Sequence, residues 1–160
     1  KRKWIGEKVE WVEVYDGKVK KFKLLKKDKI EFSYRDSNLK NKFVMNICIK
    51  LEEKRKEKII EEIRSFMNER RKKQPVGKKS AGSIFKNPEG YYAGKIIEDC
   101  GLKGFYIGDA CISEKHANFI INKGKAKSSD IYKVTEIIKE KVEEKFGIEL
   151  IPEIKIIGKF

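Results

Sequence analysis

The sequence predicts an α+β fold, in which a β-rich front of residues 1–51 precedes a mixed back half of residues 52–160. Two observations favour this fold class. In the front half, apolar and polar residues alternate, which is typical of half-buried strands. In the back half, three stretches repeat their apolar residues every three or four positions, which is typical of amphipathic helices, and short apolar runs separate them. The boundary is expected near residues 51–53.

The front half contains a predicted hairpin and one further strand. Residues 9–15 alternate, Asp16-Gly17 is a turn signal, and residues 18–25 are expected to return as the second arm. Residues 41–51 form the clearer strand. Its pattern predicts a shared face for the apolar side chains Phe43, Met45, Ile47, Ile49 and Leu51.

The back half begins with a predicted helix over residues 52–72. Basic residues collect in its last turn, where the helix dipole favours them. A second helix is expected over residues 91–101, with Gly101 as its stop signal. The apolar stripe of the first helix consists of Ile59, Ile60, Ile63, Phe66 and Met67.

A third helix is predicted over residues 130–146. Ser128 or Ser129 is expected to cap its start, and Gly147 is expected to end it. Its buried stripe is predicted to consist of Ile131, Val134, Ile138 and Val142.

Three further runs read as strands. Residues 104–108 and 117–122 are short apolar runs within the back half. Residues 148–158 form a last predicted strand that contains Pro152. Because proline has no N–H to donate to a sheet, this strand is expected at an edge.

The composition is strongly basic, with 39 Lys and Arg against 25 Asp and Glu and a net charge of +14. Such a charge favours anionic partners, either nucleic acid or a phosphorylated small molecule. Lysines that only solvate helices, as in heat-adapted proteins, give the same composition. Neither interpretation is excluded by composition.

The cysteines and the first residues of the chain predict its cellular compartment and its extent. Three widely spaced cysteines without a Cys-x-x-Cys pair predict no zinc site and a reducing, cytoplasmic compartment. No signal peptide or membrane span is recognisable, so no membrane partner is expected. Because residue 1 is Lys and a predicted strand follows almost at once, we expect a trimmed chain or a fragment.

Two polar positions in loops are candidates for chemistry. Arg35, in "YRDS", can hold an anionic group through two parallel hydrogen bonds, or it can pair with a nearby Asp. Ser83 lies among small residues, where its hydroxyl can donate a proton or cap the next turn. Lys86 and Asn87 follow it, and either can bind a polar ligand.

Two further candidates lie nearer the C-terminus. His116 is the only histidine, and it is either a structural hydrogen-bonding residue or a catalyst. Glu153 is a carboxylate in an apolar run. Facing inward it would be desolvated, with a raised pKa, and could act as an acid or a hydrogen bonder. Facing outward it would pair with Lys155.

Five motifs occur in order along the chain: "YRDSNLK", "SAGSIFKNPEG", "AGKIIEDCGLKG", "SEKHANFIIN" and "IELIPEIKIIG". Together they resemble the C-terminal part of the UDP-N-acetylenolpyruvoylglucosamine reductases, flavoenzymes of bacterial peptidoglycan precursor synthesis. The resemblance extends from Val9 to Gly158. It is to the compact, type II-like form, because Leu51 runs directly into a helix and Tyr91 follows Asn87-Pro88 almost at once.

The resemblance implies two regions and one reaction. Residues 1–51 would be the tail of an FAD-binding region, and residues 52–160 would be the substrate-binding domain. In the family reaction, NADPH reduces FAD, and the flavin passes a hydride to UDP-N-acetylglucosamine enolpyruvate to give UDP-N-acetylmuramate. Since most of the flavin-binding region is missing and no Gly-x-Gly-x-x-Gly loop is present, this chain is expected to be inactive by itself.

The resemblance also implies roles for individual residues. Ser83 occupies the proton-donor position, Arg35 would grip the enolpyruvyl carboxylate, and Glu153 would hydrogen-bond the same carboxylate region. Four residues match substrate-site positions, with His116 standing where some relatives use a glutamine: Tyr34, Lys73, Asn87 and His116. No flavin-binding residue can be assigned.

Asp109 is a departure from the family pattern, because relatives usually have a glycine there. Its acidic side chain is expected to perturb the turn before Ser113.

Two other functions stay open at this point. One is a basic nucleic-acid-binding module, although such modules interleave basic residues with exposed aromatics on one surface. Here the lysines are spread over every predicted helix and mixed with glutamates, so no nucleic-acid partner is expected. The other is a non-catalytic remnant that binds the UDP-sugar without a flavin.

Overall fold

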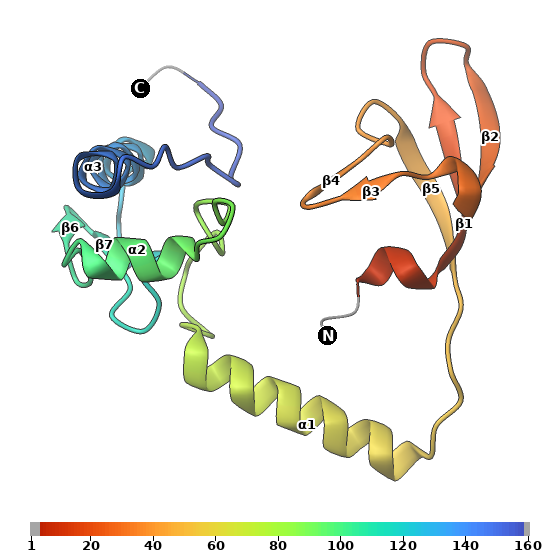
Figure 1. Ribbon diagram of the computed structural model, residues 1–160, viewed down its shortest axis with the longest axis horizontal. Helices are drawn as coiled ribbons and strands as arrows, with labels where there is room; N and C mark the ends of the chain where they lie inside the picture. Colours follow the sequence, from red (N-terminus) through yellow and green to blue (C-terminus); the bar gives the residue numbers. More distant parts are fainter. Residues whose placement is uncertain (1–3, 159–160) are drawn as a thin grey trace. The chain divides into compact units, whose positions relative to one another are not determined.

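The computed structural model describes residues 4–158 and divides the chain into two compact units, Lys1–Lys58 and Ile59–Phe160 (Figure 1). The boundary falls within helix α1 (Lys56–Lys73). Each unit has a hydrophobic core of its own. Among the described residues, no helix is long and apolar enough to cross a membrane.

The first unit is built on an antiparallel sheet with the strand order β2-β1-β5. The 3-10 helix η1 (Ile5–Lys8) leads into β1 (Val9–Asp16), and β2 (Lys21–Lys26) returns beside it. The predicted hairpin is therefore confirmed. The buried side chains of this unit's core are Val9, Val12, Val14 and Ile30.

The strand β5 (Phe43–Ile49) pairs with the other side of β1, but its predicted single apolar face is wrong. Phe43 pairs with Tyr15, whereas Ile47 pairs with Val12. Tyr15 and Val12 point to opposite faces of β1, and cross-strand partners share a face. Phe43 and Ile47 therefore lie on opposite faces. The cause is a register shift in the β1–β5 pairing, which reverses the alternation.

A small hairpin carries the first candidate site residue. After the 3-10 helix η2 (Lys27–Lys29), strands β3 (Phe32–Ser33) and β4 (Asp36–Ser37) pair antiparallel. The loop between them consists of Tyr34 and Arg35 alone. Such a short loop leaves its residues little choice of backbone conformation.

The helix α1 begins at Lys56, later than the expected residue 52, and no residue in it is buried. Its apolar stripe forms as predicted, but each member of the stripe is 38–68% exposed. The stripe therefore adds nothing to either core.

The second unit encloses its core between two helices and a small sheet (Figure 1). Helix α2 (Ala93–Asp99) ends just before Gly101, as predicted. Gly101 adopts a backbone φ of 73°, in the left-handed region. Strands β6 (Tyr106–Ile107), β7 (Ala110–Ile112) and β8 (Ile120–Asn122) form an antiparallel sheet in the order β6-β7-β8. Strand β7 was not predicted, although it is buried along its whole length.

The helix α3 (Ser128–Phe146) matches the third predicted helix and ends at Gly147, whose φ is 65°. Three of the four stripe residues are buried in the core, and the fourth, Ile131, packs against it. The predicted serine cap is wrong, because both serines lie inside the first turn. The N-cap residue is Lys127, whose N–H donates to the carboxylate of Asp130 at 2.9 Å.

The last predicted strand, residues 148–158, does not form. Within the described residues this segment makes a single isolated bridge, between Pro152 and Phe85. Pro152 lacks an N–H, so it cannot extend a regular ladder. The segment still packs on the core through Leu150.

Candidate functional site

Ser83 lies in a short extended segment that is held on both sides. On one side, Ser83 forms an isolated antiparallel bridge with Phe119. On the other, Phe85 forms one with Pro152. Three segments that are distant in sequence therefore run side by side. They are joined by isolated bridges and do not form a regular sheet at these residues.

Ile84 joins these three segments through its backbone. Its N–H donates to the carbonyl of Asn118 at 2.9 Å, and its carbonyl accepts the N–H of Glu153 at 2.7 Å. The side chain of Ile84 is buried in the core. Two predicted site residues, Ser83 and Glu153, are thus brought onto neighbouring segments by the backbone.

Asn118 is a site residue that sequence reasoning missed. Its side chain is buried, accepts the N–H of Phe85 at 2.9 Å and donates to the carbonyl of Phe85 at 2.8 Å. The side-chain amide of Asn118 therefore satisfies both backbone groups of Phe85, as the backbone of a neighbouring strand would. Its signal in the sequence was an asparagine within the otherwise apolar run "ANFII".

A hollow of about 340 Å³ lies beside the Ser83 segment, within the second unit. Two cations, Arg70 and Lys78, help to line it, and Gly82 adopts a φ of 89° there. Such a φ is readily accessible only to glycine, so the loop before Ser83 can fold back on itself. A hollow lined by small residues and cations suits an anionic group.

Lys73 and Asn87 lie at either end of this loop region. Lys73 ends α1 and forms an ion pair with Glu69, and its side chain is 70% exposed. Arg70 lines the hollow, whereas Lys73 is not among the described residues that line it. Asn87 accepts the N–H of Ala93 at 3.0 Å, which closes the loop before α2.

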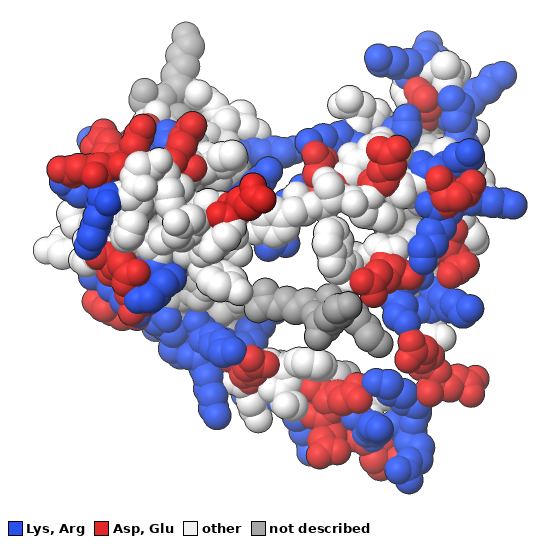
Figure 2. Space-filling view, in the orientation of Figure 1, with Lys and Arg blue, Asp and Glu red and all other residues white. Residues whose placement is uncertain are grey.

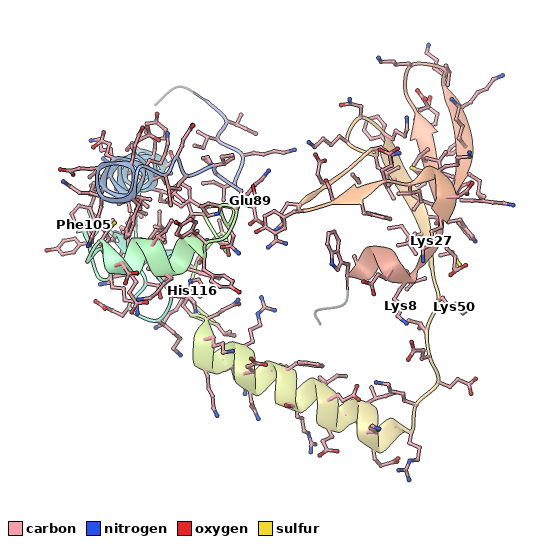
Figure 3. All side chains as sticks on the ribbon, in the orientation of Figure 1. Lys8, Lys27, Lys50, Glu89, Phe105 and His116 are labelled. Carbon is pink, nitrogen blue, oxygen red and sulfur yellow. The ribbon has the colours of Figure 1, made fainter. Side chains whose placement is uncertain are left out.

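His116 is held against the same segments. Its Nδ1 accepts the N–H of Asn118 at 3.2 Å, and its ring meets the ring of Phe119 edge-on at 4.9 Å between centroids. Figure 3 shows the ring beside α2, where a Cβ atom built on Gly94 would lie 2.6 Å from Cε1. This geometry fits a structural hydrogen-bonding role.

The protonation state of His116 follows from its surroundings. Burial lowers the pKa of His116 below its ordinary value of 6.5, and the positive charge of Lys103 acts in the same direction. Since Nδ1 accepts a hydrogen bond, the neutral ring carries its proton on Nε2. A contact between His116 and a substrate stays a prediction.

Arg35 occupies a strained position in the first unit. Its φ is 57°, in the left-handed region that non-glycine residues rarely adopt. The guanidinium carbon lies 5.8 Å from the centroid of the Tyr34 ring, and both side chains are exposed. Arg35 and Ser83 belong to different units, so their convergence on one ligand stays a prediction.

Asp109 stabilises its surroundings instead of perturbing them. It lies in the two-residue turn between β6 and β7. Its carboxylate accepts the N–H of Lys125 at 2.6 Å, and its carbonyl accepts the N–H of Lys123 at 2.8 Å. A Cβ atom built on Gly124 would lie 2.8 Å from the carboxylate. The acid therefore ties the turn to the loop after β8.

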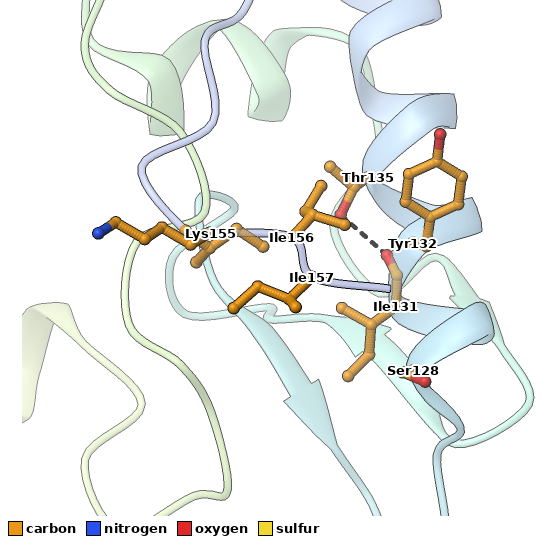
Figure 4. Close-up of a pocket in the computed structure, with 8 residues that line it drawn as sticks. Ser128, Ile131, Tyr132, Thr135, Lys155, Ile156 and Ile157 are labelled. Atoms are coloured by element: carbon orange, nitrogen blue, oxygen red, sulfur yellow. Dashed lines mark hydrogen bonds between the residues drawn. The ribbon is translucent and has the colours of Figure 1, made fainter. Parts of the chain in front are cut away.

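A second hollow, of about 250 Å³, lies between the start of α3 and the C-terminal segment (Figure 4). Half of its lining residues are isoleucines, and Thr135 there donates its hydroxyl to the carbonyl of Ile131 at 2.8 Å. Figure 4 shows Lys155 pointing away from the other labelled side chains. This lining offers little to a phosphate group, unlike the hollow beside Ser83.

Comparison with known proteins gives one consistent result. The family model described as "UDP-N-acetylenolpyruvoylglucosamine reductase, C-terminal domain" matches residues 74–157. A reductase of that name from Caldanaerobacter subterraneus is 48% identical over 152 residues, which are 94% of this chain and 50% of that protein. One from Thermotoga petrophila is 45% identical over 95% of this chain and 54% of its own length.

A solved structure agrees with these sequences. The crystal structure of UDP-N-acetylenolpyruvylglucosamine reductase from Thermus caldophilus matches with a TM-score of 0.77 and 36% identity. The match covers 91% of this chain and 52% of that one. The chain thus spans about half the length of the curated relatives it matches.

Proposed function

The chain belongs to the UDP-N-acetylenolpyruvoylglucosamine reductase family, and we propose that it supplies the substrate-binding half of such a reductase. The complete enzyme would reduce UDP-N-acetylglucosamine enolpyruvate to UDP-N-acetylmuramate in the cytoplasm. The observation that carries the proposal is the Ser83 segment. It is bridged to the segments of Phe119 and Pro152 and lies beside a hollow that contains two cations.

The residues of this chain fit the substrate better than the flavin. The basic hollow is suited to the nucleotide diphosphate, whereas the sequence contains no glycine-rich loop of the Gly-x-Gly-x-x-Gly kind for a flavin pyrophosphate. FAD, reduced by NADPH, supplies the hydride when bound, and we assign most of its site to residues outside this chain.

Ser83 is the proposed proton donor to the carbon next to the substrate carboxylate. A serine hydroxyl is a weak acid in water, so it can serve only where the developing enolate is stabilised. Arg35 is always charged and would stabilise it through two parallel hydrogen bonds to the carboxylate. Glu153, on the segment next to Ser83, would hydrogen-bond the same region.

The remaining predicted residues would orient the nucleotide sugar. Lys73 is assigned to the phosphates, and the hollow adds Arg70 and Lys78 as further candidates for that contact. Asn87 holds the loop after Ser83 in place. Tyr34 would lie beside the flavin and the substrate. His116 would act mainly by supporting Asn118, to which it is hydrogen-bonded.

A titration of the chain with UDP-N-acetylglucosamine enolpyruvate tests the proposal. We expect binding that weakens by about 10-fold or more in Arg70→Ala, because a hydrogen bond to a charged group is lost. Lys133→Ala, on α3, is the matched control, because Lys133 does not line the hollow among the described residues. Equal weakening by both changes would indicate a general effect of charge and would contradict the assignment.

The same titration, made with a random oligonucleotide at two salt concentrations, tests the nucleic-acid alternative. Figure 2 shows acidic side chains interspersed with basic ones over the face in view, which weakens any uniformly positive field. Oligonucleotide binding that falls steeply with salt, without any binding of the UDP-sugar, would overturn the proposed function. UDP-sugar binding that persists without turnover in the assembled enzyme would identify a non-catalytic remnant.

A further inference from the structure

Lys115 makes a long-range hydrogen bond that the proposed function does not use. Its Nζ donates to the carbonyl of Arg71 at 2.9 Å, which joins a turn of the second unit to the last turn of α1, 44 residues earlier. Both partners belong to the second unit, Ile59–Phe160. Because none of the described residues of α1 is buried, the end of this helix is positioned by contacts of this kind and not by burial in the core.

The turn that carries Lys115 is firmly held. Ser113 is only 2% exposed, and its hydroxyl accepts the N–H of Lys115 at 3.2 Å and the N–H of His116 at 3.3 Å. The N–H of Ser113 donates to the carbonyl of Phe119 at 2.8 Å, and Phe119 is the residue bridged to Ser83. The backbone of Lys115 is therefore fixed to the same framework as the proposed proton donor.

The carbonyl that Lys115 reaches is one of those that a helix leaves without an internal partner. The last four carbonyls of α1 belong to residues 70–73. The carbonyl of Arg70 accepts the N–H of Gln74 at 2.8 Å, and that of Arg71 accepts Lys115. A cation at this end of a helix also interacts favourably with the negative end of the helix dipole. Lys115 thus caps α1 from a segment that is distant in sequence.

The capped turn carries a cation of the hollow beside Ser83. Arg70 lines this hollow together with Gln74, and its Nε donates to the Oε1 of Gln74 at 3.1 Å. Arg70 directly precedes Arg71, so a hydrogen bond at Arg71 limits the movement of the turn from which Arg70 projects. Because Arg70 is exposed, its placement depends on the backbone beneath it. An arginine that is already held in place loses less conformational entropy when it binds an anion.

We propose that Lys115 is a positioning residue of the substrate site, which caps the end of α1 and thereby holds Arg70 in the hollow where the diphosphate of the UDP-sugar would bind. Lys115 itself is not among the described residues that line the hollow. It therefore acts through Arg70 and not by its own contact with the phosphates. The inference rests on the proposed function, since it takes the hollow to be the diphosphate site.

Amide hydrogen exchange tests the cap without any ligand. Lys115→Met keeps the length of the side chain but removes the donor and the charge. We expect exchange in the last turn of α1 to become about 2- to 5-fold faster, the usual effect of one charge at a helix end. Lys79→Met is the matched control, because Lys79 is also exposed and precedes Ser80 of the hollow, but is not among the described residues that line it. Lys79→Met should leave exchange in α1 unchanged.

A double-mutant cycle on ligand binding tests whether Lys115 acts through Arg70. Lys115→Met should weaken the binding of UDP-N-acetylglucosamine enolpyruvate by about 2- to 10-fold, the usual cost of ordering one side chain. Combined with Arg70→Ala it should add little further loss, because the effects of residues that act through one another are not additive. Lys79→Met removes the same charge, and its effect on the binding free energy should add to that of Arg70→Ala.

A conservative variant and steady-state kinetics separate positioning from a general loss of stability. Lys115→Arg keeps a cationic donor and should retain both the slow exchange and the affinity. In the chain assembled with the half of the Caldanaerobacter reductase that it does not match, Lys115→Met should raise KM and leave kcat nearly unchanged. A general loss of stability would lower the amount of active enzyme, and Arg70→Ala would not cancel that effect.

The inference is overturned if exchange in α1 is unchanged in Lys115→Met, or if its effect on binding adds fully to that of Arg70→Ala. Either result leaves the proposed function standing. Faster exchange, with UDP-sugar binding that neither Lys115→Met nor Arg70→Ala alters, would show that the cap forms but that the hollow is not the phosphate site. That result would overturn the proposed function and the positioning role together, so the two failures are distinguishable.

Discussion

At Arg35, backbone stability and the proposed function make opposite demands. A φ of 57° suits glycine, and an arginine held there costs about 1–3 kcal/mol. Arg35→Gly is therefore expected to raise the free energy of unfolding by about 1 kcal/mol, measured by thermal or urea unfolding. In the assembled enzyme the same change should weaken UDP-sugar binding by about 10- to 100-fold, since a charged hydrogen-bonding partner is lost.

Arg35→Lys is the matched variant, because it keeps the strained backbone and the positive charge but loses the two parallel hydrogen bonds. It should leave the free energy of unfolding close to that of the parent chain while still weakening binding. An Arg35→Gly chain that is less stable than the parent would show that the side chain is kept for packing.

The pKa of His116 predicts a dependence of stability on pH. Burial lowers this pKa in the folded chain below the ordinary value of 6.5, so the unfolded chain binds the proton more readily. The stabilising contribution is complete above the unfolded pKa and is lost as the pH falls through the folded pKa. We therefore expect His116→Gln to flatten the fall in the free energy of unfolding between about pH 7 and pH 5. An unchanged pH profile would contradict this role.

At the scale of elements, the side chain of Asn118 replaces a regular strand pairing around Ser83. Asn118→Ala would leave the N–H and C=O of Phe85 without their side-chain partner in a buried place. The free energy of unfolding should fall by about 2–4 kcal/mol. Asn38→Ala removes an exposed asparagine that donates to the carbonyl of Lys29 at 3.1 Å, and it should cost about 1 kcal/mol or less.

Asn118→Asp tests the donor, because an ionised carboxylate keeps the acceptor for the N–H of Phe85 but turns a second oxygen toward its carbonyl. At neutral pH the loss of stability should be at least as large as in Asn118→Ala, since the charge is buried. The loss should become smaller at low pH, where the protonated carboxyl group can donate to the carbonyl. A loss that does not depend on pH would contradict this role of the donor.

Elements with strong local signals were predictable, and elements defined by pairing partners were not. The apolar period and the stop glycines predict α2 and α3, which depend on neighbours within each helix. The face reversal in β5 depends on a register shift with β1, which no local pattern in β5 reveals. The segment around Glu153 has an alternating pattern, yet Pro152 limits it to one bridge. Asn118 was overlooked because its partner, Phe85, is distant in sequence.

At the scale of the whole molecule, the chain spans about half the length of the curated relatives it matches, and we propose that turnover requires the other half as well. Ser83→Ala should leave the fold intact, because the bridge and hydrogen bonds that hold its segment are made by the backbone and by Asn118. In the enzyme assembled with the half of a relative, we expect UDP-sugar affinity to be nearly unchanged and turnover to fall by about 10²- to 10⁴-fold. Ser65→Ala is the control, because Ser65 is exposed on α1 and is not among the described residues that line the hollow. A full rate in the Ser83 variant would assign proton donation to another group.

The charge of the whole chain is a poorer guide to function than its sites. The net charge of +14 permits nucleic-acid binding, but many of the cations lie in exposed pairs with acids, such as Lys95 with Asp99 and Lys141 with Glu144. Exposed pairs of this kind contribute little to stability. Their effect is to spread positive charge among acids, so the local hollow beside Ser83 is a better predictor of the ligand than the total.

The contact between Asp109 and Gly124 has a consequence for how sequences of this family diverge. The carboxylate occupies the space that any larger residue at position 124 would need. A chain with glycine introduced at position 109 should accept alanine at 124, whereas alanine introduced beside the existing acid should lower the free energy of unfolding. These two positions are therefore expected to covary. A larger residue at position 124 should be tolerated only after the acid at position 109 has been replaced by a smaller residue.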